Sequence, residues 1–277
     1  MTTRQDLGTA LITGGSTGIG AIYADRLARL GHDLILVARS GARLDQLAIR
    51  LQTATGRRVE TVAADLAHPA GRNRVDTILR TDDRIEVLVN NAGVGATAAL
   101  IDSDPARLQE MIAVNVAALV GLTQAAVPGM VARGSGKIIN IASVVGLAPE
   151  LLNGVYGASK AFVIAFTQSL HHELADRGVQ VQAVLPGATA TDFWRLSGRP
   201  VEELPQEIVM SAEDMVDAAI AGFFHGELVT IPSLPDVADW HAFETARRAL
   251  GPNLSRATPA ARYHTGAAAP APQRVPA

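Results

Sequence analysis

The sequence predicts an α/β protein, a doubly wound parallel sheet of about seven strands with helices on both faces. Short runs rich in valine, isoleucine and leucine recur along the chain, and segments of helical length and period separate most of them. Nearly continuous apolar runs are typical of parallel strands that helices cover on both sides. The expected strands are residues 9–13, 33–38, 59–64, 85–90, 137–143, 179–185 and 227–231.

Composition indicates one soluble domain and excludes several classes of function. The 277 residues are 48% apolar and 18% charged, which is enough for a sizeable core. The net charge is −3 with no block of either sign, so we expect neither nucleic acid nor an anionic membrane as a partner. The absence of cysteine excludes disulfides, thiolate metal sites and a cysteine nucleophile, and it fits a cytoplasmic location.

The two ends and one apolar segment bear on the domain organisation. The N-terminus lacks the apolar core and cleavage site of a secretory signal. Residues 111–132 carry no charge and are long enough to span a membrane, but they contain Asn115, Gln124 and Pro128 and fall where a buried helix is expected. We expect one domain over residues 1–251 and a disordered alanine- and proline-rich tail over residues 252–277.

A glycine-rich turn follows the first expected strand. The stretch "TGGSTGIG", residues 13–20, precedes a segment of helical period, and Gly14, Gly18 and Gly20 allow a sharp turn and close approach of a ligand to the main chain. The free N–H groups and positive dipole end of the helix would face phosphate. In this position the turn predicts a dinucleotide-binding site.

The end of the second expected strand indicates which dinucleotide is bound. An acid there would accept hydrogen bonds from the free 2′-hydroxyl of NAD, but Ala38 stands at that position and Arg39 with Ser40 follows. Arg39 suits a 2′-phosphate. Asp33, the nearby acid, lies at the opposite end of the strand, so NADP(H) is favoured over NAD(H).

One tyrosine and one lysine are spaced to converge on the same spot. In "GVYGASKAF", residues 154–162, Tyr156 and Lys160 are four positions apart, which places them on one face of a helix.

Together with other short motifs, this pair resembles the short-chain dehydrogenase/reductase family, of the NADP-preferring type, over about residues 7–232. The glycine pattern TGxxxGxG is present, "NNAG" follows the fourth strand at residues 90–93, and "PG" follows the sixth at Pro186 and Gly187. An asparagine in the long helix, Asn115, and a serine after the fifth strand, Ser143, complete the pattern. The resemblance implies a Rossmann-type fold.

The resemblance also implies roles for four catalytic residues. Tyr156 would act as general acid and base in carbonyl and alcohol chemistry, and Lys160 would lower its pKa together with the oxidised nicotinamide ring and grip the nicotinamide ribose. Ser143 would hydrogen-bond the substrate oxygen. Asn115 would hold a water that connects Lys160 to solvent.

The family's cofactor contacts fall on matching positions of this chain. Asp65 resembles the acid that bonds the adenine amino group, and Thr189 stands where the family commonly has an aliphatic residue. The expected cofactor-binding residues are Gly14, Ser16, Thr17, Gly18, Ile19, Gly20, Arg39, Ser40, Asp65, Leu66, Asn90, Gly93, Tyr156, Lys160, Pro186, Gly187, Thr189 and Thr191.

Residues 190–211 predict a mobile lid over the substrate, because they mix aromatic residues, glycine and proline at the mouth of the site. An apolar substrate would be covered by side chains of the lid and of the segment before Tyr156. The candidates are Phe193, Trp194, Leu196, Leu147, Leu151 and Val155. His171 and His172 lack the spacing of a zinc motif, and no metal is expected.

These features predict an NADP(H)-dependent oxidoreductase that interconverts a carbonyl and a secondary alcohol of a small molecule. Two alternatives remain open: an NAD-linked alcohol dehydrogenase, and a non-catalytic dinucleotide-binding sensor. The family packs its long apolar helices between subunits, so a homodimer or homotetramer is expected.

Overall fold

The computed structural model describes residues 7–263. The chain divides into two compact units, residues 1–233 and residues 234–277. The first unit holds the sheet and every expected site residue. The second contains the helix α9 (Val237–Ala249), which Asp236 caps and in which the rings of Trp240 and Phe243 stack at 5.4 Å. Part of the expected tail, residues 264–277, lies outside the described residues, and the proposed boundary after residue 251 stays a prediction.

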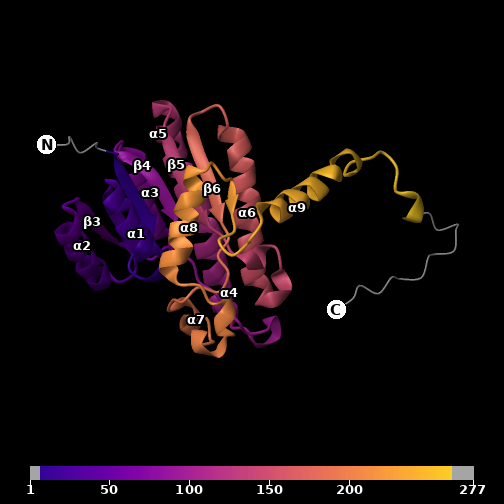
Figure 1. The fold of residues 1–277 in the computed structure, drawn as a ribbon, viewed down its shortest axis with the longest axis horizontal. Helices are drawn as coiled ribbons and strands as arrows, with labels where there is room; N and C mark the ends of the chain where they lie inside the picture. The colour runs from indigo at the N-terminus through magenta and orange to yellow at the C-terminus, as the bar shows by residue number, and fades with distance from the viewer. Residues whose placement is uncertain (1–6, 264–277) are drawn as a thin grey trace. The chain divides into compact units, whose positions relative to one another are not determined.

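The first unit is a seven-stranded parallel sheet, as expected from the apolar runs (Figure 1). Its strand order is β3-β2-β1-β4-β5-β6-β7. The strands are β1 (Thr9–Thr13), β2 (Asp33–Ala38), β3 (Val59–Ala63), β4 (Ile85–Asn90), β5 (Gly136–Ile141), β6 (Val179–Val184) and β7 (Val229–Thr230).

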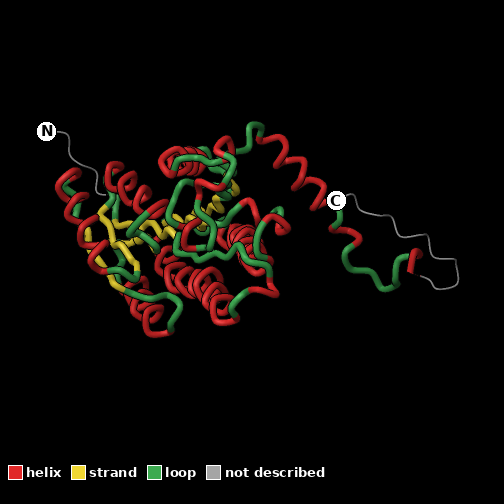
Figure 2. The backbone as a smooth tube through the Cα atoms, turned by 90° about the horizontal axis from the view of Figure 1, so that it is seen from below, coloured by secondary structure: helices red, strands yellow, loops and turns green. Residues whose placement is uncertain are grey.

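Helices cover both faces of this sheet (Figure 2). One face packs against α1 (Gly18–Leu30), α2 (Gly41–Thr55) and α8 (Ala212–Phe224), and the other against α3 (Pro69–Thr81), α5 (Leu119–Arg133) and α6 (Gly154–Leu174). Successive strand residues alternate between the two cores: Ala10 and Ile12 of β1 face α1, whereas Leu11 faces the opposite layer. The doubly wound prediction is therefore confirmed.

The strand order reverses between β1 and β4, and this reversal positions the site. The chain runs outward from β1 to β3 and then returns to pair β4 with the other side of β1. The loops that leave β1 and β4 therefore diverge at their carboxyl ends and open a crevice. Because all strands are parallel, the segments after β5 and β6 reach the same edge of the sheet.

The apolar segment that resembles a membrane span is a core helix. The continuous helical stretch Pro105–Arg133 comprises α4 (Pro105–Ile112), a π-helical turn (Ala113–Ala118) and α5, and it is long and apolar enough to cross a membrane by composition. Leu122, Ala125 and Ala126 pack into the core beneath the sheet instead. The π-helical turn carries Asn115.

Candidate active site

A single cavity of about 680 Å³ opens along the carboxyl edge of the sheet. It brings together most of the residues that the sequence predicted, from separate loops. The predicted residues that line it are Gly14, Ser16, Thr17, Gly18, Ile19, Arg39, Ser40, Asp65, Leu66, Gly93, Ser143, Tyr156, Lys160, Pro186, Gly187, Thr189 and Thr191.

The loop after β1 presents main-chain N–H groups to this cavity. Gly14 and Gly18 adopt φ values of +65° and +52°, a backbone conformation that residues other than glycine rarely adopt. α1 begins directly after the loop, its N-cap Thr17 makes no side-chain capping bond, and its first turn contains no acidic residue. The first N–H groups of α1 are thus available to an anion, and the helix dipole favours one there.

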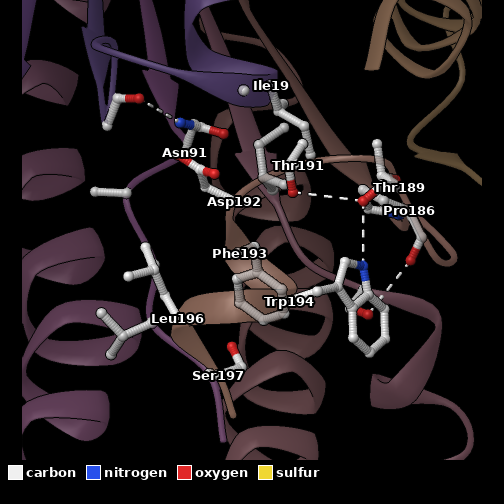
Figure 3. Close-up of a pocket in the computed structure, with 18 of the residues that line it drawn as sticks. Ile19, Asn91, Pro186, Thr189, Thr191, Asp192, Phe193, Trp194, Leu196 and Ser197 are labelled. Carbon is white, nitrogen blue, oxygen red and sulfur yellow. Dashed lines mark hydrogen bonds between the residues drawn. The ribbon is translucent and has the colours of Figure 1, made fainter. Parts of the chain in front are cut away.

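Gly20 and Asn90 do not line the cavity, and Asn91 does. A side chain at Gly20 would collide with the Gly14 carbonyl, so this glycine serves the close packing of α1 on the loop. The Asn90 side chain points from the sheet toward α5, where Nδ2 donates to Thr123 Oγ1 at 3.0 Å and to Asn140 Oδ1 on β5 at 2.9 Å. Asn91, which the sequence reasoning missed, donates from Nδ2 to the Thr13 and Gly14 carbonyls at 2.9 and 3.2 Å (Figure 3).

The end of β2 and the first turn of α2 present two arginines to the cavity, Arg39 and Arg43. Arg39 is well exposed and its Nη1 lies 3.3 Å from Glu110 Oε1 on α4. Ser40 caps α2, because its Oγ accepts from the N–H of Arg43 at 3.4 Å, and the cap brings Arg43 to the same corner. Sequence reasoning missed Arg43. Ser40 is a typical N-cap residue, and such a cap bonds the N–H of the residue two or three positions later, which would have indicated that Arg43 lies near it.

The opposite end of β2 carries Asp33, as expected. Its carboxylate pairs with Arg57 at 2.8 Å, away from the cavity. Asp65 and Leu66, after β3, lie on the cavity wall, and Asp65 Oδ1 accepts from the N–H of Ala67 at 2.9 Å. This corner therefore holds two guanidinium groups and no carboxylate from the end of β2.

α6 begins at a buried cap that fixes Tyr156. The side chain of Asn153 accepts from the N–H groups of Val155 and Tyr156 at 3.0 and 3.4 Å, and its Nδ2 donates to the Ala98 carbonyl at 2.7 Å. The first turn of α6 is thereby tied to the loop after β4. The hydroxyl of Tyr156 then makes a hydrogen bond with the side chain of Ser143, which follows β5.

Lys160 lies one turn further along α6 and is buried with Tyr156. Its Nζ donates to the Ile141 carbonyl at the end of β5, at 2.8 Å, and lies 5.8 Å from the centroid of the Tyr156 ring. Ser143 Oγ also donates to the Pro186 carbonyl at 3.3 Å, which links the ends of β5 and β6. The side chains of Tyr156, Lys160 and Ser143 thus lie together on the wall of the cavity.

Burial determines the protonation states of Tyr156 and Lys160. It raises the pKa of Tyr156 well above its ordinary value, and the hydrogen bond with Ser143 only partly opposes that effect. Burial lowers the pKa of Lys160 to about 8. At neutral pH the phenol is therefore protonated and the ammonium is charged.

Asn115 lies behind the cavity wall rather than on it. Its Oδ1 accepts from the N–H of Val94 at 2.9 Å, and its Nδ2 donates to the Val94 carbonyl at 2.9 Å and to Ser159 Oγ at 3.0 Å. These bonds tie the π-helical turn to the loop after β4 and to α6. The regular helical bonding is interrupted in this turn, so the main chain of Asn115 is also available to hold a water.

The lid is fastened at its base and near its middle. At its base, residues 188–190 pair with Met210 through a short β-bridge, and Trp194 Nε1 donates to the Thr189 carbonyl at 3.1 Å (Figure 3). Further along the lid, the Ser197 carbonyl accepts from both the N–H and Oγ1 of Thr97, at 3.1 and 3.0 Å. Between these bonds the short helix α7 (Phe193–Leu196) places the Phe193 ring 5.6 Å from the Tyr156 ring.

The lid encloses an apolar chamber next to Tyr156. Of the side chains expected to line it, Phe193, Trp194, Leu196 and Leu151 do so, whereas Leu147 and Val155 do not. Further apolar side chains complete the lining. They are Val94, Val145, Leu152, Leu204, Pro205 and Ile208.

Comparison with known proteins agrees with this architecture. The family model described as "short chain dehydrogenase" matches residues 8–200, so the chain belongs to the short-chain dehydrogenase family. It is 47% identical to a short-chain dehydrogenase from Sphingobium yanoikuyae solved in complex with NADPH, with a TM-score of 0.90 over 92% of this chain and 99% of the other.

Two further relatives are named for the compounds on which they act. The bulky-bulky ketone specific alcohol dehydrogenase from Comamonas testosteroni is 42% identical, with a TM-score of 0.87 over 94% of this chain and 100% of its own. Very-long-chain 3-oxoacyl-CoA reductase from Mus musculus is 34% identical over 216 residues, which are 76% of this chain and 67% of the mouse protein.

Proposed function

We propose that the protein is an NADP(H)-dependent reductase of bulky apolar ketones, with Tyr156 as the proton donor. The observation that carries this proposal is the buried Tyr156 hydroxyl, which is bonded to Ser143 and adjoins Lys160 in the same cavity as the glycine loop. An acid, an oxyanion-stabilising hydroxyl and a cation beside a phosphate-binding turn are the groups that carbonyl reduction requires.

The residues of the cavity fit a bound NADP(H). The free N–H groups of the loop from Gly14 to Gly18 would hold the pyrophosphate, Asp65 and Leu66 would adjoin the adenine, and Arg39 and Arg43 would bind the 2′-phosphate. The reduced cofactor supplies a hydride to the carbonyl carbon. The NADPH complex of the Sphingobium relative supports this choice of cofactor.

The protein's own groups handle the charge and the proton at the carbonyl oxygen. Ser143 Oγ donates a hydrogen bond to that oxygen and stabilises the negative charge that grows on it during the reaction. Tyr156, held protonated by burial, gives its proton to the same oxygen. The Lys160 ammonium stabilises the resulting phenolate until it is reprotonated.

The chamber supports the substrate class. Its walls carry valine, leucine, isoleucine, phenylalanine and tryptophan side chains, and Tyr156 lines the same cavity. A bound ketone with large apolar groups would shield these walls from water. The burial would stabilise the complex by about 25 cal/mol per Å² of apolar surface. The specificity that the name of the Comamonas relative states agrees with such a chamber.

We also infer that the protein is a homodimer or homotetramer, joined through the helices α4, α5 and α6. Phe162 on α6 stacks on Phe166 at 5.9 Å yet keeps 39% of its surface exposed, and Ile112 at the end of α4 is 43% exposed. Sedimentation equilibrium at micromolar concentration tests this. A monomer would contradict it without affecting the catalytic proposal.

The Tyr156→Phe variant tests the catalytic proposal. It should lose ketone reduction by at least a hundredfold, because the proton donor is absent, while NADPH binding measured by fluorescence stays within about twofold. Tyr23→Phe is the matched control, since Tyr23 is equally buried in the core away from the cavity. Turnover by Tyr156→Phe at the wild-type rate would refute the proposal.

A further inference from the structure

Ser197, the residue that ends α7, has a buried hydroxyl without a hydrogen-bond partner. Only 8% of the residue is exposed. Its main chain is fully used: the N–H donates to the Phe193 carbonyl at 2.9 Å, and the carbonyl accepts from Thr97. A buried hydroxyl left without a partner destabilises the fold, so its presence points to a partner that binds.

Ser197 is one of the residues that line the cavity, and its hydroxyl is buried behind the cavity surface. The buried polar group on α7, the Trp194 indole N–H, already donates to the Thr189 carbonyl. Among the buried lid side chains that the structure describes, Ser197 is therefore the one with a polar atom still to be satisfied. Figure 3 shows the Ser197 hydroxyl directed toward the Phe193 ring.

The Phe193 ring connects this hydroxyl with the reaction centre. On one side it contacts the Tyr156 ring at 5.6 Å. On the other it lies against Gly95, where an added Cβ would stand 2.8 Å from Ser197 Oγ and would collide with Phe193 Cζ. A substrate that turns this ring aside meets Tyr156 and Ser197 together.

We propose that Ser197 is a specificity-determining residue whose hydroxyl donates a hydrogen bond to a second carbonyl oxygen of the substrate. The preferred substrates are accordingly bulky apolar ketones with a second carbonyl, such as diketones and 3-oxo esters or thioesters. This inference rests on the proposed function, since it concerns the same chamber. The absence of a side chain at Gly95 lets Phe193 and Ser197 pack against it, and the second carbonyl takes the place of the Phe193 ring when that ring turns aside.

The experiment compares matched ketones that differ in the second carbonyl. Ethyl benzoylacetate is paired with hexanophenone, and benzil with deoxybenzoin, in steady-state reduction with NADPH. Ser197→Ala should lower kcat/KM by about five- to tenfold for at least one dicarbonyl compound, the size of one lost hydrogen bond, and change its monoketone partner by less than twofold. Ser197→Cys, similar in size but a weak donor, should show the same selective loss.

The outcomes separate this inference from the proposed function. An equal loss on both members of each pair, or no loss on any compound, overturns the role of Ser197 while leaving the reductase intact. If the wild-type protein reduces none of the four ketones, the proposed function fails first. Thermal unfolding of both variants shows whether a general loss comes from misfolding.

Discussion

Replacing Lys160 by methionine should make the protein more stable and inactive. The ammonium is buried, and its pKa is about 8 in the fold against an ordinary value of 10.5. That difference corresponds to about 3 kcal/mol that the folded state loses at neutral pH by keeping the group charged. Methionine has a similar length and fills the same space without a charge.

The replacement also removes one hydrogen bond, to the Ile141 carbonyl. Leaving that carbonyl without its donor costs about 1 kcal/mol. The net gain is then about 2 kcal/mol, which for a chain of this size raises Tm by about 4–8 °C. Lys137→Met is the control, because Lys137 is the chain's other lysine and is only half-buried.

The pH dependence makes the prediction specific. Between the folded pKa of about 8 and the ordinary value of 10.5, the unfolded chain binds more protons than the folded one, so wild-type stability rises with pH through this window. The gain in free energy of unfolding of Lys160→Met over the wild type should therefore be complete below pH 8 and shrink toward pH 10.5. Urea unfolding at pH 7 and at pH 10 measures it. An advantage that is absent at pH 7, or equal at both pH values, would refute the burial argument.

Three further predictions concern the cofactor and the reaction. Arg39→Ser should raise KM for NADPH by about 10- to 100-fold and leave KM for NADH nearly unchanged, whereas an equal rise for both would exclude a 2′-phosphate contact. Gly18→Ala should weaken NADPH binding and stability, because its φ is +52° and the new Cβ would lie 3.1 Å from Thr191 Cγ2; Gly121→Ala, which meets nothing within 4 Å, should do neither. The rate of ketone reduction should fall as pH rises through about 8, where Lys160 loses its charge, and a rate that stays flat to pH 10 would contradict a role for the ammonium.

The sequence was sufficient for the elements that depend on local pattern. Apolar runs separated by helical segments predicted every strand of the sheet, and the glycine turn, Tyr156 and Lys160, which the sequence singled out, line one cavity. The two asparagines of "NNAG" show where this reasoning ends. Alternation along β4 and the bonds to Thr123 and Asn140 turn the Asn90 side chain toward α5, so its neighbour Asn91 reaches the cavity.

The lid contacts could not be read from the chain. Thr97 and Ser197 meet across one hundred residues, and neither stands in a pattern that announces the other. The unpaired hydroxyl of Ser197 and the position of Phe193 over Tyr156 depend on that contact. Local propensity carries no information about such a pairing, because it is decided by how the loops after β4 and β6 meet at the sheet edge.

The buried ammonium of Lys160, which lowers the stability of the fold, lies on α6, and this helix is held to β5 by specific contacts. Thr167, seven residues after Lys160 and hence on the same face of α6, accepts from Asn140 Nδ2 on β5 at 2.9 Å. Gly146 lets the segment after β5 approach α6 so closely that a Cβ there would stand 2.9 Å from the Ala161 nitrogen. Because Ile141 ends β5 and Ser143 follows two residues later, these contacts fix the height of α6 against the partners of Lys160 and Tyr156. The same packing that removes the ammonium from water therefore holds it and the phenol in register with the serine.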